Sequence, residues 1–456
     1  MDIDLEDPGE QAGRLSRRDL LKGAAAVGLA GSTLTWREIV GSQSVWAKSP
    51  LSGNVVFWNL FGGGDGARMI QLEQGFQKAN PHVKLRATTL AWGIPYYTKL
   101  TTSTVAGSPP SVAILHLSRM ASFAPKGLFT ELDPAMLAKF GITQSTVSKQ
   151  AWDMAHYNGK LYAIPLDTHP LVMYYNTKIA RKAGLLGANG RLKALHGETA
   201  VMQAIQKAQH HAQVGLAISV AGAGETMPWR FWHAAYKQMG GDELSRDGKK
   251  VTLNAAHGAR ATAFLHDITQ KYKVAGAHVD YPASVALFNS QKAAFMWNGE
   301  WEATTFQKSG IPFDMTLFPN LFGSSATWAD SHAFAIPRNH SMSQQQLEAN
   351  LTFISYVLKH SFVWAEGGHI PAYLPVVHSA AYKKLTPQSH YAAEARDVVY
   401  DPIAPFSGAA GPMETSAGKT FQAVMTGQSS PGQGYSEFAA SLQKFAGSSG
   451  GPPGTE

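Results

Sequence analysis

The residues whose types and spacing suggest catalysis lie in two places. Glu300 and Glu302 flank Trp301, and a glycosidase needs two carboxylates on either side of one bond. At an expected helix start, however, side chains two residues apart point in different directions. The pair therefore favours glycoside hydrolysis only weakly.

The second place is a glycine-rich turn. Gly62, Gly64 and Ala67 stand between an expected strand and an expected helix, as in a dinucleotide-binding turn. Nucleotide binding would also need an acidic residue at the end of the next strand to hold a ribose, and the run 88–92 has none. We therefore expect the turn to offer backbone N–H groups to hydroxyls, a carboxylate or a phosphate instead.

The sequence gives no sign of a metal centre. Its 17 histidines are scattered, whereas a metal site needs histidines and carboxylates close together. His210 and His211 are adjacent on an expected helix, so their side chains diverge by about 100° and cannot easily share one ion. The absence of cysteine excludes disulfides, thiolate metal sites, iron–sulfur clusters and a lipid-bearing cysteine. We predict no metal and no cofactor.

The hydrophobic pattern predicts an α/β protein. A strand, a helix and a second strand between residues 54 and 90 form a βαβ unit, and a buried strand follows at 111–115. Ligands of such sheets bind outside the carboxyl ends of the strands. His116 and Arg119, which follow the strand at 111–115, are therefore candidate binding residues.

The stretch 157–176 predicts a crossing between two lobes. Asn158-Gly159 is a turn signal that opens a strand, and Pro165 indicates an edge or crossing strand. The polar run 167–170 then separates it from a strand at 171–175 that is apolar on both faces.

A second connection between the lobes is expected over residues 328–332, which include Asp330. The runs 314–318 and 333–336 on either side of it have the character of strands. We expect both strands to belong to the first lobe.

Length and composition agree with a two-lobe protein. A chain of 456 residues is too long for one ordinary core. We place the first lobe at 48–165 plus 312–358 and the second at 166–311 plus 359–446. With 44% apolar and 16% charged residues the chain is globular, and its net charge of +7 comes without a dense basic run, so no nucleic-acid partner is expected.

The N-terminal region has the features of an export signal. Ser16-Arg17-Arg18-Asp19-Leu20-Leu21-Lys22 matches the twin-arginine signature, and an apolar run at 23–34, too short to span a bilayer, follows it. We expect residues 1–47 to be removed after export of the folded protein. The Gly/Ser/Pro tail at 447–456 is expected to be disordered.

Several stretches, in the same order along the chain, resemble the sugar class of bacterial ABC-transporter solute-binding proteins, the extracellular solute-binding protein family 1. The segment 158–176 has that family's pattern NGKLY-x-x-P, a polar stretch and then YYN. The other stretches are VVFWNLFGG, a P-x-V strand ending near Ala113, Gly127-Leu128-x-x-x-Leu132-Asp133, Ala183-Gly184-Leu185, Phe288-x-x-x-Lys292-Ala-Ala-Phe-Met, Asn298-Gly-x-Trp301 and Gly367 to Pro371. Together they cover most of residues 52–375.

The resemblance implies the two-lobe, type II periplasmic-binding-protein fold, in which the lobes close on a ligand about a hinge. It places the family's stacking tryptophan at Trp301. At the position of His169 maltose-binding relatives have a glutamate, so the ligand should differ from maltose. With the polar and aromatic residues on expected loops, the predicted binding set is Asn59, Phe61, Gly63, Trp92, His116, Arg119, Asp167, His169, Trp229, Trp301, Asp330 and Tyr373.

Indole rings beside polar groups suit a sugar, because the C–H face of a pyranose stacks on indole and its hydroxyl rim needs donors and acceptors. We therefore expect a monomeric, non-enzymatic receptor that captures a carbohydrate or polyol in the periplasm or at the cell surface. It would deliver this ligand to the membrane permease of an ABC transporter. Glycerol 3-phosphate or glycerophosphodiesters are an alternative ligand class, and a secreted cofactor-dependent oxidoreductase or glycosidase is an alternative activity.

Overall fold

The computed structural model describes residues 53–222 and 224–448. The expected export signal at 1–47 and the last eight residues of the expected tail therefore lie outside the described residues. Within the described ranges, no helix combines the length and the apolar character needed to cross a bilayer.

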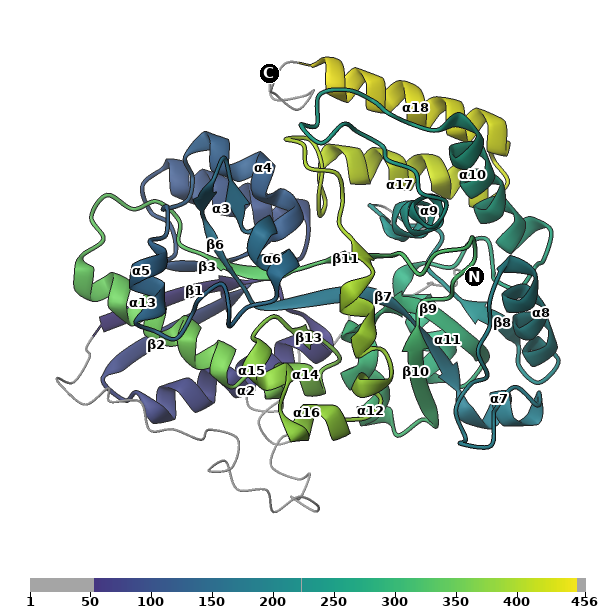
Figure 1. Ribbon diagram of the computed structural model, residues 1–456, viewed down its shortest axis with the longest axis horizontal. Helices are drawn as coiled ribbons and strands as arrows, with labels where there is room; N and C mark the ends of the chain where they lie inside the picture. The colour runs from purple at the N-terminus through teal and green to yellow at the C-terminus, as the bar shows by residue number, and fades with distance from the viewer. Residues whose placement is uncertain (1–52, 223, 449–456) are drawn as a thin grey trace, which may run out of the picture. The chain divides into compact units, whose positions relative to one another are not determined.

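The first of two main sheets has five strands in the order β2, β1, β3, β12, β6 (Figure 1). β1 pairs parallel with β2 and β3, whereas β12 runs antiparallel between β3 and β6. The strands are β1 (Gly53–Asn59), β2 (Val83–Thr89), β3 (Val112–His116), β6 (Ala163–Pro165) and β12 (His332–Ala335). The expected βαβ unit is therefore present.

Helices cover this sheet because each buries an apolar stripe against it. α2 (Gly63–Ala79) buries Met69, Leu72 and Phe76 on its inner face, while Ala79 is exposed at the helix end. We call each main sheet, together with the helices around it, a part of the protein. The other helices of the first part include α3 (Ile94–Val105), α4 (Met120–Phe123), α5 (Pro134–Ala138), α6 (Lys149–Met154), α13 (Gln344–Lys359) and α14 (Phe362–Glu366).

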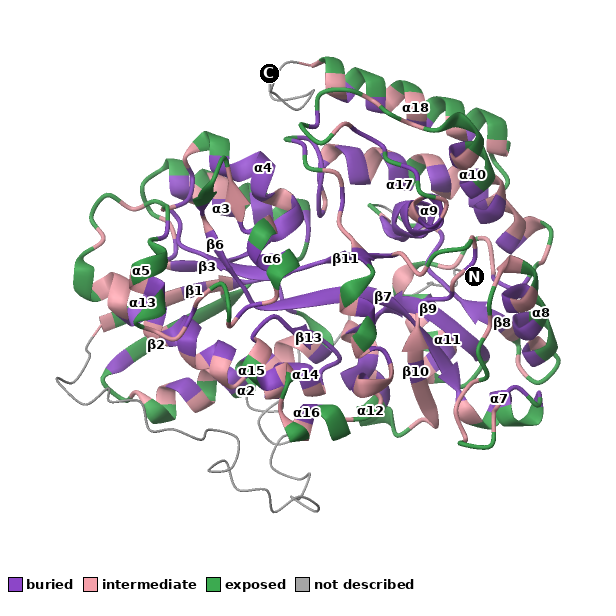
Figure 2. Ribbon diagram, viewed as in Figure 1, coloured by how far each residue is buried: buried purple, intermediate pink, exposed green. Residues whose placement is uncertain are grey.

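The second sheet has β7 at its centre, with β10 and β13 also paired to that strand. All ten residues of β7 are buried, as expected for an interior strand (Figure 2). The strands are β7 (Asp167–Asn176), β8 (Val214–Ala217), β9 (Ala293–Gly299), β10 (Phe313–Leu317), β11 (Thr327–Asp330), β13 (Ile370–Pro371) and β14 (Val398–Val399).

Four helices of the second part pack on one another in a separate layer above β11 in the view of Figure 1. They are α9 (Met227–Gln238), α10 (Ala255–Gln270), α17 (Pro412–Met425) and α18 (Pro431–Gly447). Their shared core is aromatic, with Trp232 stacked on Tyr236 and on Phe421. The remaining helices here include α7 (Thr177–Lys182), α8 (Glu198–Gln209), α11 (Tyr281–Asn289) and α12 (Ala303–Ser309).

The chain passes between the two sheets near the places that the sequence predicts, but the polar run 167–170, expected to separate two strands, is the first part of β7. β6 ends at Pro165 on the edge of the first sheet, and β7 begins at Asp167 in the second. The return runs from β11 through Ser331 into β12. A third segment lies beside these two, because β13 pairs with the first residues of β7. The start of β7 is thus the meeting point of three chain segments.

The strand expected at 314–318 forms, but its expected place in the first lobe is wrong. This strand, β10, pairs antiparallel with the second half of β7, so it belongs to the second sheet. Conversely, Trp364 and Val376 were expected in the second lobe and pack into the hydrophobic core of the first sheet. Alternation of polar and apolar residues reveals a strand but does not reveal its partner. The lobe boundaries otherwise stay a prediction.

A half-buried carboxylate on α2, that of Glu73, makes stability depend on pH. Burial raises the pKa of Glu73 from its ordinary 4.5 to about 7, so the folded chain binds an extra proton between these values. This contribution to stability is complete below pH 4.5 and is lost as the pH rises through 7. We expect Glu73→Gln to gain on the order of 2 kcal/mol relative to wild type between pH 5 and pH 8.

Urea unfolding of both proteins at each pH measures this difference. A difference in unfolding free energy that is equal at pH 5 and pH 8 would show that Glu73 titrates normally.

Candidate functional site

A cavity of about 540 Å³ opens between loops of the first sheet and loops of the second. The first-sheet side comes from the connections after β1 and β2, the end of β3 and the start of β12. The opposite side comes from the start of β7, the loop after β8, the starts of α9 and α11, and the turn after β9. It is lined by Leu60, Phe61, Gly62, Asp65, Trp92, His116, His169, Ala221, Gly222, Gly224, Glu225, Thr226, Met227, Arg230, Asp280, Tyr281, Pro282, Trp301 and His332.

Arg230 occupies the centre of an aromatic cluster in this cavity. Its guanidinium carbon lies 4.1 Å from the ring centroid of Trp328, 5.7 Å from that of Trp92 and 5.8 Å from that of Trp301. Its Nε donates to Glu414 at 2.9 Å, so the buried charge is paired. The guanidinium therefore connects indoles from both sides of the cavity through cation–π contacts.

The indole of Trp301 is held in one orientation. Its Nε1 donates to the Tyr281 hydroxyl at 2.6 Å, and that hydroxyl donates to Glu302 at 2.6 Å. The ring lies over Gly299, where an added Cβ would come within 1.8 Å of it. The sequence pattern Asn298-Gly-x-Trp301 thus has a steric reason, because only glycine leaves room for the ring at this spacing.

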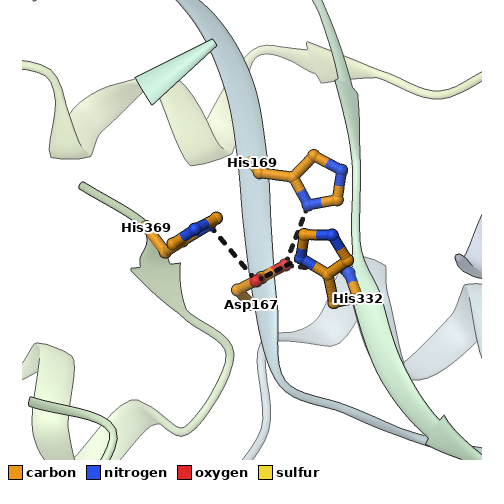
Figure 3. A group of neighbouring side chains, drawn as sticks. All are labelled: Asp167, His169, His332 and His369. Carbon is orange, nitrogen blue, oxygen red and sulfur yellow. Dashed lines mark hydrogen bonds and ion pairs between the residues drawn. The ribbon is translucent and has the colours of Figure 1, made fainter. Parts of the chain in front are cut away.

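Beneath the cavity, three histidines surround Asp167 (Figure 3). Nδ1 of His169 lies 3.0 Å from one oxygen of Asp167, and Nδ1 of His332 lies 2.8 Å from the other. His369 approaches from the segment before β13, with Nδ1 at 3.3 Å. Trp364 also donates to this carboxylate, at 2.7 Å.

These contacts determine the protonation states of Asp167 and His169. Burial alone would raise the pKa of Asp167, but His332 and His169 outweigh it and hold the pKa well below its usual range. Burial, reinforced by His332, lowers the pKa of His169 to about 3, so its ring is neutral. A neutral ring donates one hydrogen bond and keeps one lone pair.

His369 differs because it faces several carboxylates. Burial alone would lower its pKa, but Asp65, Glu300 and Asp167 together raise it well above its usual value. Its Nε2 donates to Asp65 at 2.9 Å. Burial raises the pKa of Glu300 to about 8, even though His369 lies 3.0 Å away and acts in the opposite direction.

Residues 71–393 match the sequence profile of the bacterial extracellular solute-binding protein family. The chain belongs to this family. Curated binding proteins of Brucella abortus and Brucella suis are 25% identical to it over 137 residues. That stretch covers 30% of this chain and 32% of theirs, so it spans only about a third of these relatives.

Solved structures establish the fold of this solute-binding protein. The GacH receptor of Streptomyces glaucescens superposes with a TM-score of 0.73 at 20% identity, over 87% of this chain and 99% of that one. A Listeria monocytogenes substrate-binding protein gives 0.72 at 20% identity, over 86% and 98%. A Thermotoga lettingae solute-binding protein gives 0.73 at 19%, over 87% and 100%. The fold is the type II periplasmic-binding-protein fold, as expected.

Five of the residues predicted to bind ligand in this solute-binding protein line the cavity. They are Phe61, Trp92, His116, His169 and Trp301. Trp92 is the most open of them, with 40% of its surface exposed, and its ring meets His116 edge-on. The rule that ligands bind at the carboxyl ends of strands thus finds the first-sheet side of the cavity correctly.

Two predicted residues lie directly behind the lining. Asp167 supports His169 and His332, as described above. Asp330 accepts hydrogen bonds from the backbone N–H of Ser118 and Ser331 and from the Ser118 hydroxyl. Burial raises the pKa of Asp330 to about 7.

The remaining predicted residues do not line the cavity, and each has a local reason. Trp229 is wholly buried in the aromatic core of the second part, where its Nε1 donates to Asp401 at 2.8 Å. Tyr373 packs into the core of the first sheet. The guanidinium of Arg119 lies over the ring of Tyr97, with 5.0 Å between the guanidinium carbon and the ring centroid.

Asn59 and Gly63 shape the turn after β1 without lining the cavity. The Asn59 oxygen accepts from the backbone N–H of Phe61 at 3.2 Å and from the Thr89 hydroxyl at 2.9 Å. Gly63 begins α2 at a φ of 52°, a conformation that favours glycine. Both residues therefore position Phe61, which does line the cavity.

Sequence reasoning missed much of the second-sheet side of the cavity. Glu225 and Arg230 follow strand β8 through a glycine-containing loop, and Asp280 caps α11 just before Tyr281. The strand-end rule that found His116 would have found Glu225 had it been applied to β8. Nothing in the local sequence marks His332, whose place depends on the pairing of β12 with β3.

The carboxylate pair considered for glycoside hydrolysis does not face the cavity. Glu300 is fully buried beside His369, and Glu302 accepts the hydrogen bond of Tyr281. Neither residue lines the cavity, so the two cannot flank one bond of a ligand bound there.

The fit of Trp301 over Gly299 can be tested by adding one methyl group. In Gly299→Ala the new Cβ would meet the indole ring, so we expect the protein to lose about 1–3 kcal/mol of unfolding free energy as the ring is displaced. Gly432→Ala is the matched control, because its Cβ would meet no atom within 4 Å. Equal stability of the two variants in chemical denaturation would contradict this packing.

Proposed function

We propose that this protein captures a sugar or oligosaccharide outside the cytoplasm and presents it to the membrane permease of an ABC transporter. The supporting observation is the placement of Trp92 and Trp301 around a single guanidinium, that of Arg230. Indole faces suit the apolar C–H face of a pyranose, and charged and hydroxyl groups beside them suit its rim. No bond of the ligand is changed in this function.

The solved relatives support the same ligand class. The GacH receptor was solved in complex with acarbose, the Listeria protein in complex with cycloalternan, and the Thermotoga protein bound with α-D-tagatose. These ligands range from a single sugar to oligosaccharides. A cavity of about 540 Å³ falls within the usual range for small-molecule sites, and we propose that it takes a ligand of this kind.

Export and assembly are proposed from the sequence. The twin-arginine signature at residues 16–22 supports export of the folded protein, with function in the periplasm or at the cell surface. We further propose that the protein acts as a monomer whose two parts close on the ligand about the crossing strands.

Glycerol 3-phosphate and related phosphodiesters are less favoured as ligands. Asp65, Glu225 and Asp280 all line the cavity, and Arg230 already has a carboxylate partner in Glu414. A phosphate in this cavity would therefore face carboxylates and find its one arginine already paired.

A thermal-shift screen distinguishes these ligand classes. We expect neutral sugars or oligosaccharides to raise the unfolding temperature, and glycerol phosphates and phosphodiesters to leave it unchanged. Stabilisation by the phosphates alone would reject the sugar assignment. Release of a hydrolysed sugar by the purified protein would favour a glycosidase instead.

Trp301 is expected to carry much of the binding energy. Trp301→Ala removes the stacking face, so the dissociation constant for the best sugar of the screen should rise at least tenfold, about 1.4 kcal/mol, in titration calorimetry. Two tryptophans outside the cavity serve as controls. Trp58→Ala alters a half-buried indole on β1, and Trp229→Phe alters a core indole. Both should retain wild-type affinity; an unchanged affinity in Trp301→Ala would contradict the assignment.

A further inference from the structure

The residues around Asp167 have the composition of a metal site. Asp167 and His169 are the first and third residues of β7, His332 is the first residue of β12, and His369 directly precedes β13 (Figure 3). Each offers one ligand atom, and the four atoms all lie within 4.8 Å of one another. Histidines that look scattered in the sequence are thus brought together by strand pairing.

The ligand atoms lie nearly as close together as the ligands of one ion. Two ligands bound to one ion at about 2.0–2.1 Å in near-tetrahedral or octahedral geometry lie roughly 2.9–3.4 Å apart. Nδ1 of His332 and of His369 lie 2.8 and 3.3 Å from Oδ2 of Asp167, and Nδ1 of His169 lies 3.0 Å from Oδ1. An ion could therefore take its place among these atoms after small side-chain adjustments.

His369 is oriented as a metal ligand would be. Its Nε2 donates to Asp65 at 2.9 Å, an arrangement that leaves Nδ1 as the atom with a free lone pair when the ring is neutral. Without a metal, Nδ1 forms ion pairs with Glu300 at 3.0 Å and with Asp167 at 3.3 Å. The ring therefore has to release its Nδ1 proton when this atom coordinates an ion, as imidazole ligands do.

Outer contacts fix the remaining ligands. Trp364 donates to Asp167 and stacks on His369 with ring centroids 4.3 Å apart. His169 and His332 stack at 4.1 Å, which turns both Nδ1 atoms toward the same carboxylate. Such outer contacts orient metal ligands and support their affinity.

We propose that Asp167, His169, His332 and His369 bind one divalent transition-metal ion of the zinc class. Three imidazoles and one carboxylate suit zinc, cobalt or nickel, whereas calcium and magnesium prefer oxygen ligands. Because His169 and His332 also line the cavity, the ion has a path of entry from it. The ion fastens β7, β12 and the segment before β13 to one another. This role is separate from sugar capture and does not depend on it.

Full-length protein purified without a polyhistidine tag and treated with EDTA provides the test. Titration calorimetry with zinc chloride should show one equivalent bound per chain with micromolar or tighter affinity. At 100 times the dissociation constant, zinc should raise the thermal midpoint by roughly 3 °C or more, and magnesium should have no effect. Absence of a bound equivalent together with an unchanged midpoint would overturn the proposal, leaving Asp167 as the centre of a hydrogen-bond network only.

Variants identify the ligands. His369→Gln and His169→Asn should each weaken zinc binding at least tenfold, and Asp65→Asn, which alters only the partner of His369, should weaken it about 10- to 100-fold.

His390→Gln is the control, because His390 pairs with Asp314 and lies outside the proposed set. His116→Gln tests the alternative group of His116, His169 and Asp330, whose ligand atoms also lie within 4.8 Å of one another. Zinc affinity that is lost in His116→Gln and kept in His369→Gln would overturn the assignment of these four ligands. The wild-type titration decides the proposal even if a variant fails to fold.

Discussion

The arrangement of the two sheets depends on a buried carboxylate, that of Asp167. A charge with no solvent exposure costs several kcal/mol unless hydrogen bonds and neighbouring charges compensate for it. Asp167 receives that compensation from His169 on its own strand, from the ring and backbone N–H of His332 on β12, and from Trp364 on α14. These donors lie on separate segments, so satisfying the charge requires the crossing segments to stay in register. The network that stabilises Asp167 therefore also fixes the base of the cavity.

Above this base, the cavity is lined by aromatic side chains, one of which is held in place by residues that lie outside the cavity or at its edge. Trp301 is fixed by its hydrogen bond to Tyr281 and by contact with Gly299, so its side chain has little conformational entropy left to lose. Trp92 is 40% exposed, so its side chain has more freedom to adapt than that of Trp301. Arg230 contacts both indoles while its charge is paired with Glu414. Such a site is largely formed in advance on one side and adjustable on the other.

Local sequence signals predicted much of the fold because each describes a short-range physical preference. The turn at Asn158-Gly159 and the edge position of Pro165 both follow from backbone conformations that one or two residues impose. The same holds for the burial of residues 171–175 of β7, which their unbroken apolar run predicts. Strand β10 was assigned to the wrong sheet because its pairing with β7 is a choice between distant partners.

The residues of the candidate site likewise fall into those that local sequence signals predict and those that only the tertiary structure places. The sequence by itself determined the solute-binding family and the two crossings, and it predicted the place of Trp301 in the cavity lining, where Gly299 is a local steric requirement. Only the tertiary structure decided that Trp229 fills a core while Arg230, one position later, faces the cavity. It alone brought His332 within 2.8 Å of Asp167, 165 residues earlier in the chain. The physical reason is that periodicity and turn preference act over a few residues, whereas a buried polar cluster forms only when distant strands pair in one register.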